Sequence, residues 1–462
     1  MESKTNLFVY FAALSVNFMS FSSGGAFSWA SPVIPKLNGK VNPENNPLPE
    51  PLTTVEESWI ASLISIGASI GPIIAGYLSE KIGRKKTLLA FSVPIIMSHL
   101  MCAFANNVHI FYIARILLGI SIGCSFSVIP NYIGEIAEDN NRGLLFCVMP
   151  VMCNLGVLFN YAVGPFISIK MLSFISLVPM LLFVTLVGIF VPESPYYLAG
   201  IENQTGVEDS LRKLRSKSEG DIKKEALYIS ECVAETKKNQ GSFTDLIQSR
   251  GLMRGLMITC GLMVFQQFSG INAVLAYMQS IFDATGMTLP PEYSSICIGV
   301  IQLFTIGLTA PLIDRLGRRI LLLFSTIGSC LSLITLGWYF YLKNNGVEVN
   351  AISWLPIASL ILFIVMFNLG IGPLPWTIMG ELFPSNVKSM ASTISSCTCM
   401  SLGFLISMFF PLLTESLGMA MSFWLFSACL GCGTIFITLT VPETKGRSLM
   451  EIQNLLNNED KK

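Results

Sequence analysis

Charged side chains are scarce in this sequence of 462 residues. Asp, Glu, Lys and Arg together make up 13% of it, against roughly a quarter in an ordinary soluble domain. Hydrophobic residues make up 52%, and the mean hydropathy is +0.62. The formal net charge is zero, so the basic surface that nucleic-acid binding requires is not expected. This composition indicates a protein that crosses a lipid bilayer several times.

Histidine is nearly absent, since the chain holds only His99 and His109. The twelve cysteines lie mostly inside apolar runs, where cysteine usually serves as a small hydrophobic residue. Without histidine partners, the CTC (397–399) and CLGC (429–432) segments are not expected to bind metal. No nucleophile and base stand in a recognisable pattern. We therefore expect no metal, no cofactor and no enzymatic activity.

Long apolar runs, by contrast, are abundant. A transmembrane helix needs about 17–25 mostly apolar residues, and twelve runs of suitable length are present. They lie near residues 7–29, 58–79, 87–105, 112–134, 144–165, 171–191, 253–279, 293–313, 320–341, 353–379, 391–411 and 419–441. The fifth, seventh and tenth are the least uniformly apolar, so they are the best candidates for a functional site.

The distribution of Lys and Arg predicts the orientation, because basic residues gather on the cytosolic side of a membrane protein. With twelve spans, both termini lie on one side. If that side is the cytosol, 24 of the 29 basic residues are cytosolic, four are external and Arg115 lies inside a span. We therefore expect both termini in the cytosol, and a plasma-membrane location.

The two halves of the chain repeat each other. GYLSEKIGRK (76–85) matches APLIDRLGRR (310–319), and VPES (191–194) matches VPET (441–444). Parallel six-span halves place a substrate site between them, near the middle of the membrane. The expected divisions are a first bundle (1–192), a cytosolic linker with amphipathic helices (193–252), a second bundle (253–442) and a short tail (443–462).

Several ordered motifs resemble the sugar-porter branch of the major facilitator superfamily. They are GYLSEKIGRKK, the 114–143 segment, VPESPYYL, FQQFSGINAVLAY, DRLGRR, GIGPLPWTIMGELFP and VPETKGRSL. Within that branch, FSSGGAFSWASP (21–32), the QQFSGINAV run and GELFP look most like arthropod facilitated trehalose and glucose transporters. The resemblance implies an all-α membrane protein of two six-helix bundles, which carries a sugar by alternating access.

The stretch FQQFSGINAVLAY (265–277) places Gln266, Gln267 and Asn272 inside an apolar run. An unsatisfied amide in lipid costs several kcal/mol, so these side chains must face protein, water or a ligand. They converge best if the helix breaks at Ser269-Gly270-Ile271. Uncharged amides complement sugar hydroxyls, and the resemblance assigns the three residues to sugar contact. The alternative is that they only hydrogen-bond neighbouring helices.

The resemblance extends to other pocket positions, with differences. Gln302 stands where an asparagine is usual on the eighth span, and Asn368 where an acid is common on the tenth. Pro150 replaces a sugar-binding glutamine on the fifth span, and Cys399-Met400 replaces an Asn-Trp pair on the eleventh. We expect Gln302 and Asn368 to contact the sugar, while the sugar specificity stays open.

The segment GIGPLPWTIMGELFP (370–384) is expected to bend. Prolines lack the backbone donor of a helix and glycines are pliable, so we predict a gating hinge. Trp376 offers a flat face to the C–H side of a sugar ring, or alternatively packs in the core. The hinge residues are Gly370, Gly372, Pro373 and Pro375.

Charged residues recur with the same spacing at the cytosolic ends of both halves. We predict that they form a latch, which closes the cytosolic side in the outward-facing state; the alternative is ordinary snorkelling at the membrane edge. Tyr196 stands where the resemblance leads us to expect an arginine, which weakens this latch. The latch residues are Glu80, Arg84, Glu135, Arg142, Glu193, Asp314, Arg318, Arg319, Glu381, Lys388 and Glu443.

The first span contains no acidic residue. The resemblance implies that in proton-coupled relatives an arginine at the position of Arg115 pairs with an aspartate on the first span. The absence of that aspartate favours facilitative uniport of a sugar such as trehalose or glucose, and a structural role for Arg115. The alternatives are proton–sugar symport and a non-transporting sugar sensor. The expected partners are the sugar and the lipid bilayer, with no obligate protein partner.

Overall fold

The computed structural model describes residues 6–39, 46–138, 140–238, 246, 248–286, 289–447 and 449–458. Within these ranges, eleven helical segments are long and apolar enough to cross a membrane. The last of them is two spans in one, because Gly418 (φ 81°, ψ 163°) interrupts α18 (Ser385–Thr440) with a non-helical backbone. The twelve spans expected from the sequence are therefore present.

The first six spans are formed by seven α-helices. They are α1 (Leu7–Ser28) and α2 (Ala30–Leu37), which together form the first, then α3 (Thr54–Ile82), α4 (Arg84–Ala103), α5 (Val108–Ile136), α6 (Arg142–Val163) and α7 (Ile169–Ile189). The short 3-10 helix η2 (Gly164–Phe166) follows α6.

The last six spans begin with a broken helix, α12 (Arg250–Phe268) and α13 (Ile271–Thr285). They continue with α14 (Pro291–Leu316), α15 (Arg318–Asn344), the 3-10 helix η3 (Asn350–Ile352), α16 (Leu355–Leu369), α17 (Leu374–Leu382) and α18. Outside the spans lie α8 (Pro195–Gly200), α9 (Gln204–Leu214), α10 (Glu219–Lys238) and α19 (Leu449–Asn458).

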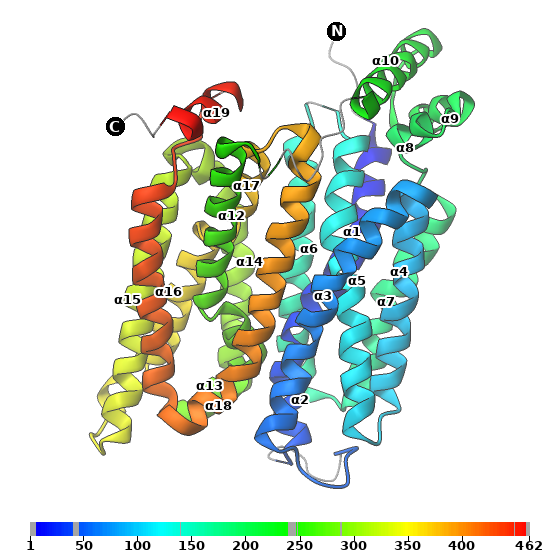
Figure 1. The fold of residues 1–462 in the computed structure, drawn as a ribbon. Helices are drawn as coiled ribbons and strands as arrows, with labels where there is room; N and C mark the ends of the chain where they lie inside the picture. Colours follow the sequence, from blue (N-terminus) through cyan, green and yellow to red (C-terminus); the bar gives the residue numbers. More distant parts are fainter. Residues whose placement is uncertain are drawn as a thin grey trace.

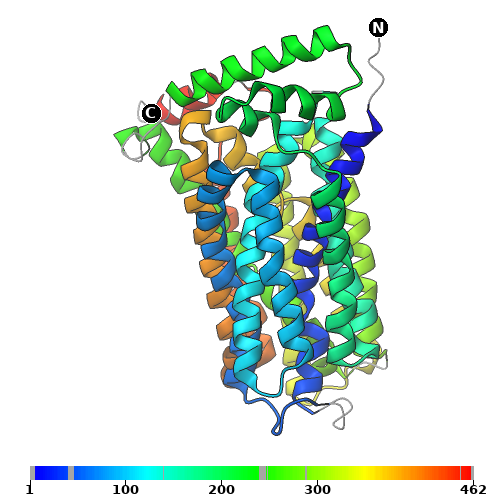
Figure 2. The ribbon, with the colours of Figure 1, turned by 90° about the vertical axis from the view of Figure 1, so that its right-hand side faces the viewer.

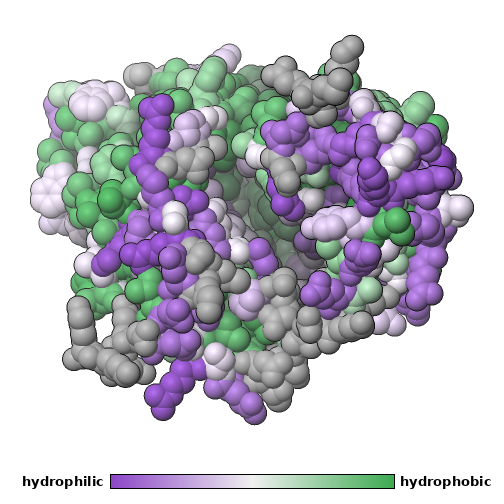
Figure 3. All heavy atoms as spheres, turned by 90° about the horizontal axis from the view of Figure 1, so that it is seen from above, coloured by the Kyte–Doolittle hydropathy of each residue, from purple (hydrophilic) through white to green (hydrophobic). Residues whose placement is uncertain are grey.

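The two sets of spans form two bundles that stand side by side (Figure 1). Helices α8–α10, α19 and the start of α1 all lie at one end of the bundles, which we call the terminal face (Figures 1 and 2). The other end, which carries α2 and the turn from α4 to α5, we call the opposite face. Figure 3 looks onto the terminal face and shows a hollow between the two bundles, ringed by polar residues.

Glycines let helices of the first bundle approach closely. Gly67 and Gly71 on α3 face Gly119 and Gly123 on α5, and each pair has the G-x-x-x-G spacing. A Cβ atom on any of the four would overlap the backbone of the facing helix, for example the Ile116 carbonyl in the case of Gly67. Small residues at such contacts let backbones touch, which stabilises helix pairs where lipid gives no hydrophobic driving force.

Hydrogen bonds join the bundles near the opposite face. The Tyr161 hydroxyl on α6 donates to the carbonyl of Leu275 on α13 (2.9 Å). The Gln279 backbone N–H of α13 donates to the Ser31 hydroxyl on α2 (3.1 Å). At the terminal face, Arg84–Glu135 and Arg318–Glu381 each lie within one bundle, while the ion pairs of Arg212, Arg215 and Lys217 lie within the linker helices or join them to the first bundle. The structure is therefore closed at the opposite face and open at the terminal face.

The linker helices are attached to the first bundle. Lys217 pairs with Glu138, which follows α5 (3.0 Å). The nearly buried Arg215 pairs with Glu225 on α10 (2.9 Å) and donates to the carbonyl of Ile136 (2.7 Å). These contacts hold α9 and α10 against the first bundle.

We expect Gly67→Ala to destabilise the first bundle. The added methyl would collide with backbone rather than with a movable side chain, and overpacking of this kind costs about 1–3 kcal/mol. The measurement is the unfolding temperature of the purified protein in detergent. Gly76→Ala on the same helix is the control, because its methyl would meet nothing within 4 Å. Equal unfolding temperatures for the two variants would contradict the role of close packing.

Candidate substrate-binding site

The seventh span is broken where the sequence predicts. α12 ends at Phe268 and α13 begins at Ile271, and between them Gly270 has φ +82°. That left-handed conformation favours glycine. A Cβ atom there would also lie 2.5 Å from the ring of Phe426. The break turns α13 relative to α12, so that polar side chains on both sides of it meet.

The three amides of the seventh span form one hydrogen-bonded cluster. Asn272 Nδ2 donates to Gln267 Oε1 (2.7 Å), and Gln267 Nε2 donates to the Cys399 sulfur on α18 (2.9 Å). The Cys399 thiol donates in turn to Gln266 Oε1 (3.5 Å). Gln266 and Gln267 are each 5% exposed, whereas Asn272 is half-buried at the edge of the cluster. Residues distant in sequence thus assemble a preformed set of donors and acceptors.

The tenth span is broken beside this cluster. α16 ends at Leu369 and α17 begins at Leu374, and the carbonyls of Ile371 and Gly372 in the gap accept from Gln266 Nε2 (3.0 and 2.6 Å). Gly370 also has a packing role, because a Cβ atom on it would overlap Ser325 of α15. The predicted hinge residues therefore surround the broken segment. Pro373 and Pro375 lie at the start of α17, where a proline removes no hydrogen bond of the helix because the first N–H groups have no partner within it. The half-buried Trp376 lies on α17.

Two further predicted residues are buried with one polar atom unpaired. Gln302 on α14 is 7% exposed and Asn368 on α16 is 6% exposed. Gln302 Oε1 and Asn368 Nδ2 have no hydrogen-bond partner among the described residues. Buried polar atoms are normally satisfied by protein, water or ligand. These two atoms consequently mark places where a hydroxyl group would be stabilised.

Residues 8–456 match the family model described as "Sugar (and other) transporter". The chain belongs to this sugar transporter family. The facilitated trehalose transporter Tret1 of Culex quinquefasciatus is 33% identical over 446 residues, which cover 96% of this chain and 84% of that protein. Tret1 of Bombyx mori is 33% identical over 444 residues, which cover 96% of this chain and 85% of the relative.

Solved structures similar to this sugar transporter include the inward-open xylose transporter XylE of E. coli. The two align with a TM-score of 0.80 at 24% sequence identity, over 97% of this chain and 99% of that chain. XylE bound to 6-bromo-6-deoxy-D-glucose aligns with a TM-score of 0.75 over the same shares of the two chains. The likeness establishes the twelve-helix, two-bundle fold of the transporter family.

Some residues near the site were not predicted from the sequence. A small cavity between the bundles is lined by Asn272 together with Ser65 of α3 and Ser407 of α18. Tyr277, at a kink in α13, donates to the carbonyls of Glu57 (3.5 Å) and Ser407 (3.4 Å). Serine is common in every span, so no sequence signal distinguishes Ser65 or Ser407. Tyr277, by contrast, is the last residue of the FQQFSGINAVLAY motif, so its position in that motif was a signal that could have identified it.

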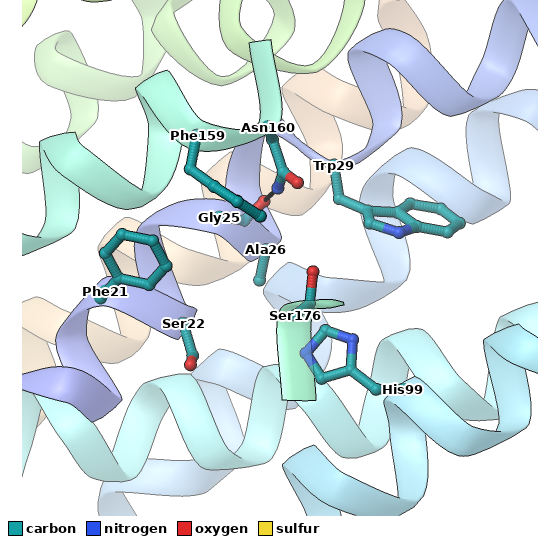
Figure 4. Close-up of a pocket in the computed structure, with 9 residues that line it drawn as sticks. All are labelled: Phe21, Ser22, Gly25, Ala26, Trp29, His99, Phe159, Asn160 and Ser176. Atoms are coloured by element: carbon teal, nitrogen blue, oxygen red, sulfur yellow. Dashed lines mark hydrogen bonds between the residues drawn. The ribbon is translucent and has the colours of Figure 1, made fainter. Parts of the chain in front are cut away.

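A second small cavity lies inside the first bundle, between α1, α4, α6 and α7 (Figure 4). In that view the amide of Asn160 donates to the Gly25 carbonyl, and the ring of His99 borders the space from α4. His99 Nε2 has no hydrogen-bond partner among the described residues. This cavity is separate from the amide cluster, which belongs to the second bundle.

Arg115 is fully buried and bonded to backbone. Its Nε donates to the Ile60 carbonyl (2.9 Å), its Nη1 donates to the Ala26 carbonyl (2.8 Å), and its guanidinium lies 5.2 Å from the ring centre of Trp29. No ion pair joins it to an acid in the part of the chain that the structure describes. These contacts agree with the structural role expected from the sequence.

The charged motifs of the two halves adopt the same geometry. Arg84 pairs with Glu135 (2.9 Å) in the first bundle, and Arg318 pairs with Glu381 (2.8 Å) in the second. Likewise the carbonyl of Gly134 accepts from Arg142, and that of Gly380 accepts from Lys388. Each pair lies within one bundle, as expected if the latch is parted. Of the remaining predicted members, Glu80 is exposed, and the side chain of Asp314 lies outside the described residues.

Glu193 and Glu443 cap the helices that follow the charged motifs. Glu193 accepts from the Lys85 backbone N–H (3.0 Å). Glu443 accepts from the backbone N–H groups of Arg318 (3.0 Å) and Arg319 (3.1 Å) at the start of α15. Partial burial works to raise the pKa of the Glu443 carboxyl, but the backbone donors outweigh it and hold the pKa below its ordinary value of 4.5.

Glu443→Gln is therefore expected to remove a pH-dependent stabilisation. A depressed folded-state pKa means that the carboxylate stabilises the fold above the ordinary pKa, and that this is lost as pH falls through the folded value. The wild-type protein should unfold at a higher temperature than the variant at pH 7, and the gap should shrink below about pH 4.5. Glu231→Gln, at an exposed position of α10, is the control for charge removal. A gap that is constant with pH would contradict the assignment.

Gln267→Ala is expected to abolish most sugar uptake while the protein still reaches the cell surface. The substitution removes both an acceptor for Asn272 and a donor to Cys399, and each hydrogen bond contributes about 1 kcal/mol. We expect at least about a tenfold loss of uptake, since contacts to sugar and to neighbours are lost together. Surface labelling gives the amount of protein. Gln204→Ala, at an exposed position of α9, is the control. Normal uptake by Gln267→Ala would contradict the assignment of Gln267 to the sugar-binding site.

Proposed function

We propose that this protein is a facilitative sugar transporter that works by alternating access, with trehalose and glucose as the leading substrates. The observation that supports it most is the preformed amide cluster of Gln266, Gln267 and Asn272, at a helix break between two repeated bundles. Neutral donors and acceptors suit a neutral, hydroxyl-rich molecule. The names of the Culex and Bombyx relatives make trehalose the first sugar to test.

The cycle follows from which contacts join the bundles. In the present state the opposite face is held shut by the Tyr161–Leu275 and Gln279–Ser31 hydrogen bonds. In the other state these bonds break, and the charged clusters of the two bundles meet at the terminal face to close it. Arg84, Glu135, Arg318 and Glu381 then act as a latch between bundles. The breaks beside Gly270 and Gly370 let α13 and α17 move as gates.

The terminal face is assigned to the cytosol, because it carries the excess of Lys and Arg. The proposed location is the plasma membrane, and the proposed halves are residues 1–192 and 253–442. Uniport is favoured over proton coupling, since the first span lacks an acid and two nitrogens of Arg115 donate to backbone carbonyls. The proposed activity is movement of sugar without chemical change, so it is not enzymatic.

Uptake of labelled glucose and of labelled trehalose by transporter-deficient cells tests the proposal. Flux of at least one sugar should saturate, run in either direction down its gradient and survive a protonophore at fixed external pH. Collapse with the protonophore would instead support proton–sugar symport. Sugar binding without counterflow in proteoliposomes would support the sensor. Cells that express the protein at the surface and take up neither sugar would contradict the proposed substrates.

A further inference from the structure

The sugar contacts discussed so far belong to one bundle. Gln266, Gln267, Asn272, Gln302 and Asn368 all lie on helices of the second half. A ligand shifts a conformational equilibrium only by binding the two states differently. A sugar held by one bundle alone would gain nothing from their closure. Some residue of the first bundle must therefore contact the sugar, and Pro150 cannot do so through a side-chain hydrogen bond.

Besides Ser65 of α3, which borders the small cavity beside Asn272, Asn154 on α6 is a polar residue of the first bundle that is placed for this contact. It is 8% exposed, and its Oδ1 has no partner among the described residues. Its Nδ2 donates to the Pro150 carbonyl (2.8 Å). Because a carbonyl only accepts, this bond fixes the amide orientation and directs the unpaired oxygen away from the α6 backbone.

The face of α6 that carries Asn154 looks toward the second bundle. Leu158 and Tyr161 follow Asn154 at i+4 and i+7, so the three share one face of the helix. A Cβ atom on Gly299 of α14 would lie 3.1 Å from Leu158 Cδ1 and 3.2 Å from Tyr161 Cδ2. The Tyr161 hydroxyl reaches across to α13. By contrast, Asn160 donates to a carbonyl of α1 within its own bundle.

Helix register places Gln302 opposite Asn154. α6 runs from the terminal face to the opposite face, and α14 runs the other way (Figure 1). Asn154 lies four residues toward the terminal face from Leu158, or about 6 Å, and Gln302 lies three residues, or about 4.5 Å, in the same direction from Gly299. Asn154 also lies about 10 Å from Tyr161 toward the terminal face, which is the level of the α12–α13 break.

Two buried carbonyl oxygens from opposite bundles, Asn154 Oδ1 and Gln302 Oε1, thus have no donor, and the helix register puts their residues at a similar level of the α6–α14 contact. We propose that this pair is a specificity-determining subsite that binds two adjacent hydroxyls of the sugar, one hydroxyl donating to each oxygen. The inference rests on the proposed function and extends it, because it gives the first bundle a grip on the substrate. Each hydroxyl has one hydrogen to donate, so two neighbouring hydroxyls satisfy both oxygens and link the bundles.

A panel of monodeoxy sugars tests the pairing. Each derivative of glucose, or of trehalose if uptake identifies that sugar, lacks one hydroxyl and competes with labelled parent sugar for uptake. In the wild-type protein, loss of either of two adjacent hydroxyls should weaken inhibition about 3- to 10-fold. Asn154→Leu should abolish the penalty for one of them, and Gln302→Leu should abolish it for its neighbour.

Asn160→Leu, on the same helix, is the matched control and should leave the pattern of penalties unchanged. If Asn154→Leu does not give a monodisperse protein in detergent, Gln302→Leu and the smaller Asn154→Val provide the same comparison. Unchanged penalties in the Asn154 and Gln302 variants, or penalties at hydroxyls that are not adjacent, would overturn the subsite while leaving sugar transport intact. A wild-type protein that carries neither sugar would instead refute the proposed function.

Discussion

A polar group inside the membrane is costly unless it finds a partner, and this constraint governs the structure from helix ends to binding site. Where a span stays helical, its backbone satisfies itself. Where a span breaks, as at Gly270 and at Gly370–Pro373, the freed carbonyls need donors from elsewhere. Gln266 meets that need by donating to the carbonyls of Ile371 and Gly372. One broken span therefore stabilises the other, and Gln266, which we propose contacts the sugar, also satisfies carbonyls freed by the break in the tenth span.

The same constraint separates rigid contacts from changeable ones. Within the first bundle, α3 and α5 touch backbone to backbone through four glycines, and Arg115 is bonded to two carbonyls. Such contacts have no alternative partner, so a bundle moves as a unit. Between bundles, the hydrogen bonds near the opposite face are single ones, such as those from Tyr161, Gln279 and Tyr277. Each contributes about 1 kcal/mol, which suits a joint that opens and closes repeatedly.

The repeated charged motifs adopt equivalent geometry in the two halves. Arg84–Glu135 and Arg318–Glu381 occupy equivalent places, and Glu193 and Glu443 cap equivalent helices. Each half is thereby self-sufficient at the terminal face in the present state. The linker helices are attached to the first bundle, because Arg215 donates to the carbonyl of Ile136 and Lys217 pairs with Glu138. A latch between the bundles then costs little to release, since its members keep partners within their own half.

Features that depend on local pattern can be predicted from the residues alone. Apolar run length predicts the spans, the Lys and Arg bias predicts their orientation, and Gly270 inside QQFSGINAV predicts the break, because each follows from the chemistry of neighbouring residues. Only the tertiary structure decided which side chains meet. That Gln267 bonds Cys399, that Arg84 and Arg318 pair within their own bundles, and that Leu158 lies against Gly299 all depend on the rotation and register of packed helices. Those pairings are set by long-range packing and by which face is closed, and no short stretch of sequence carries that information.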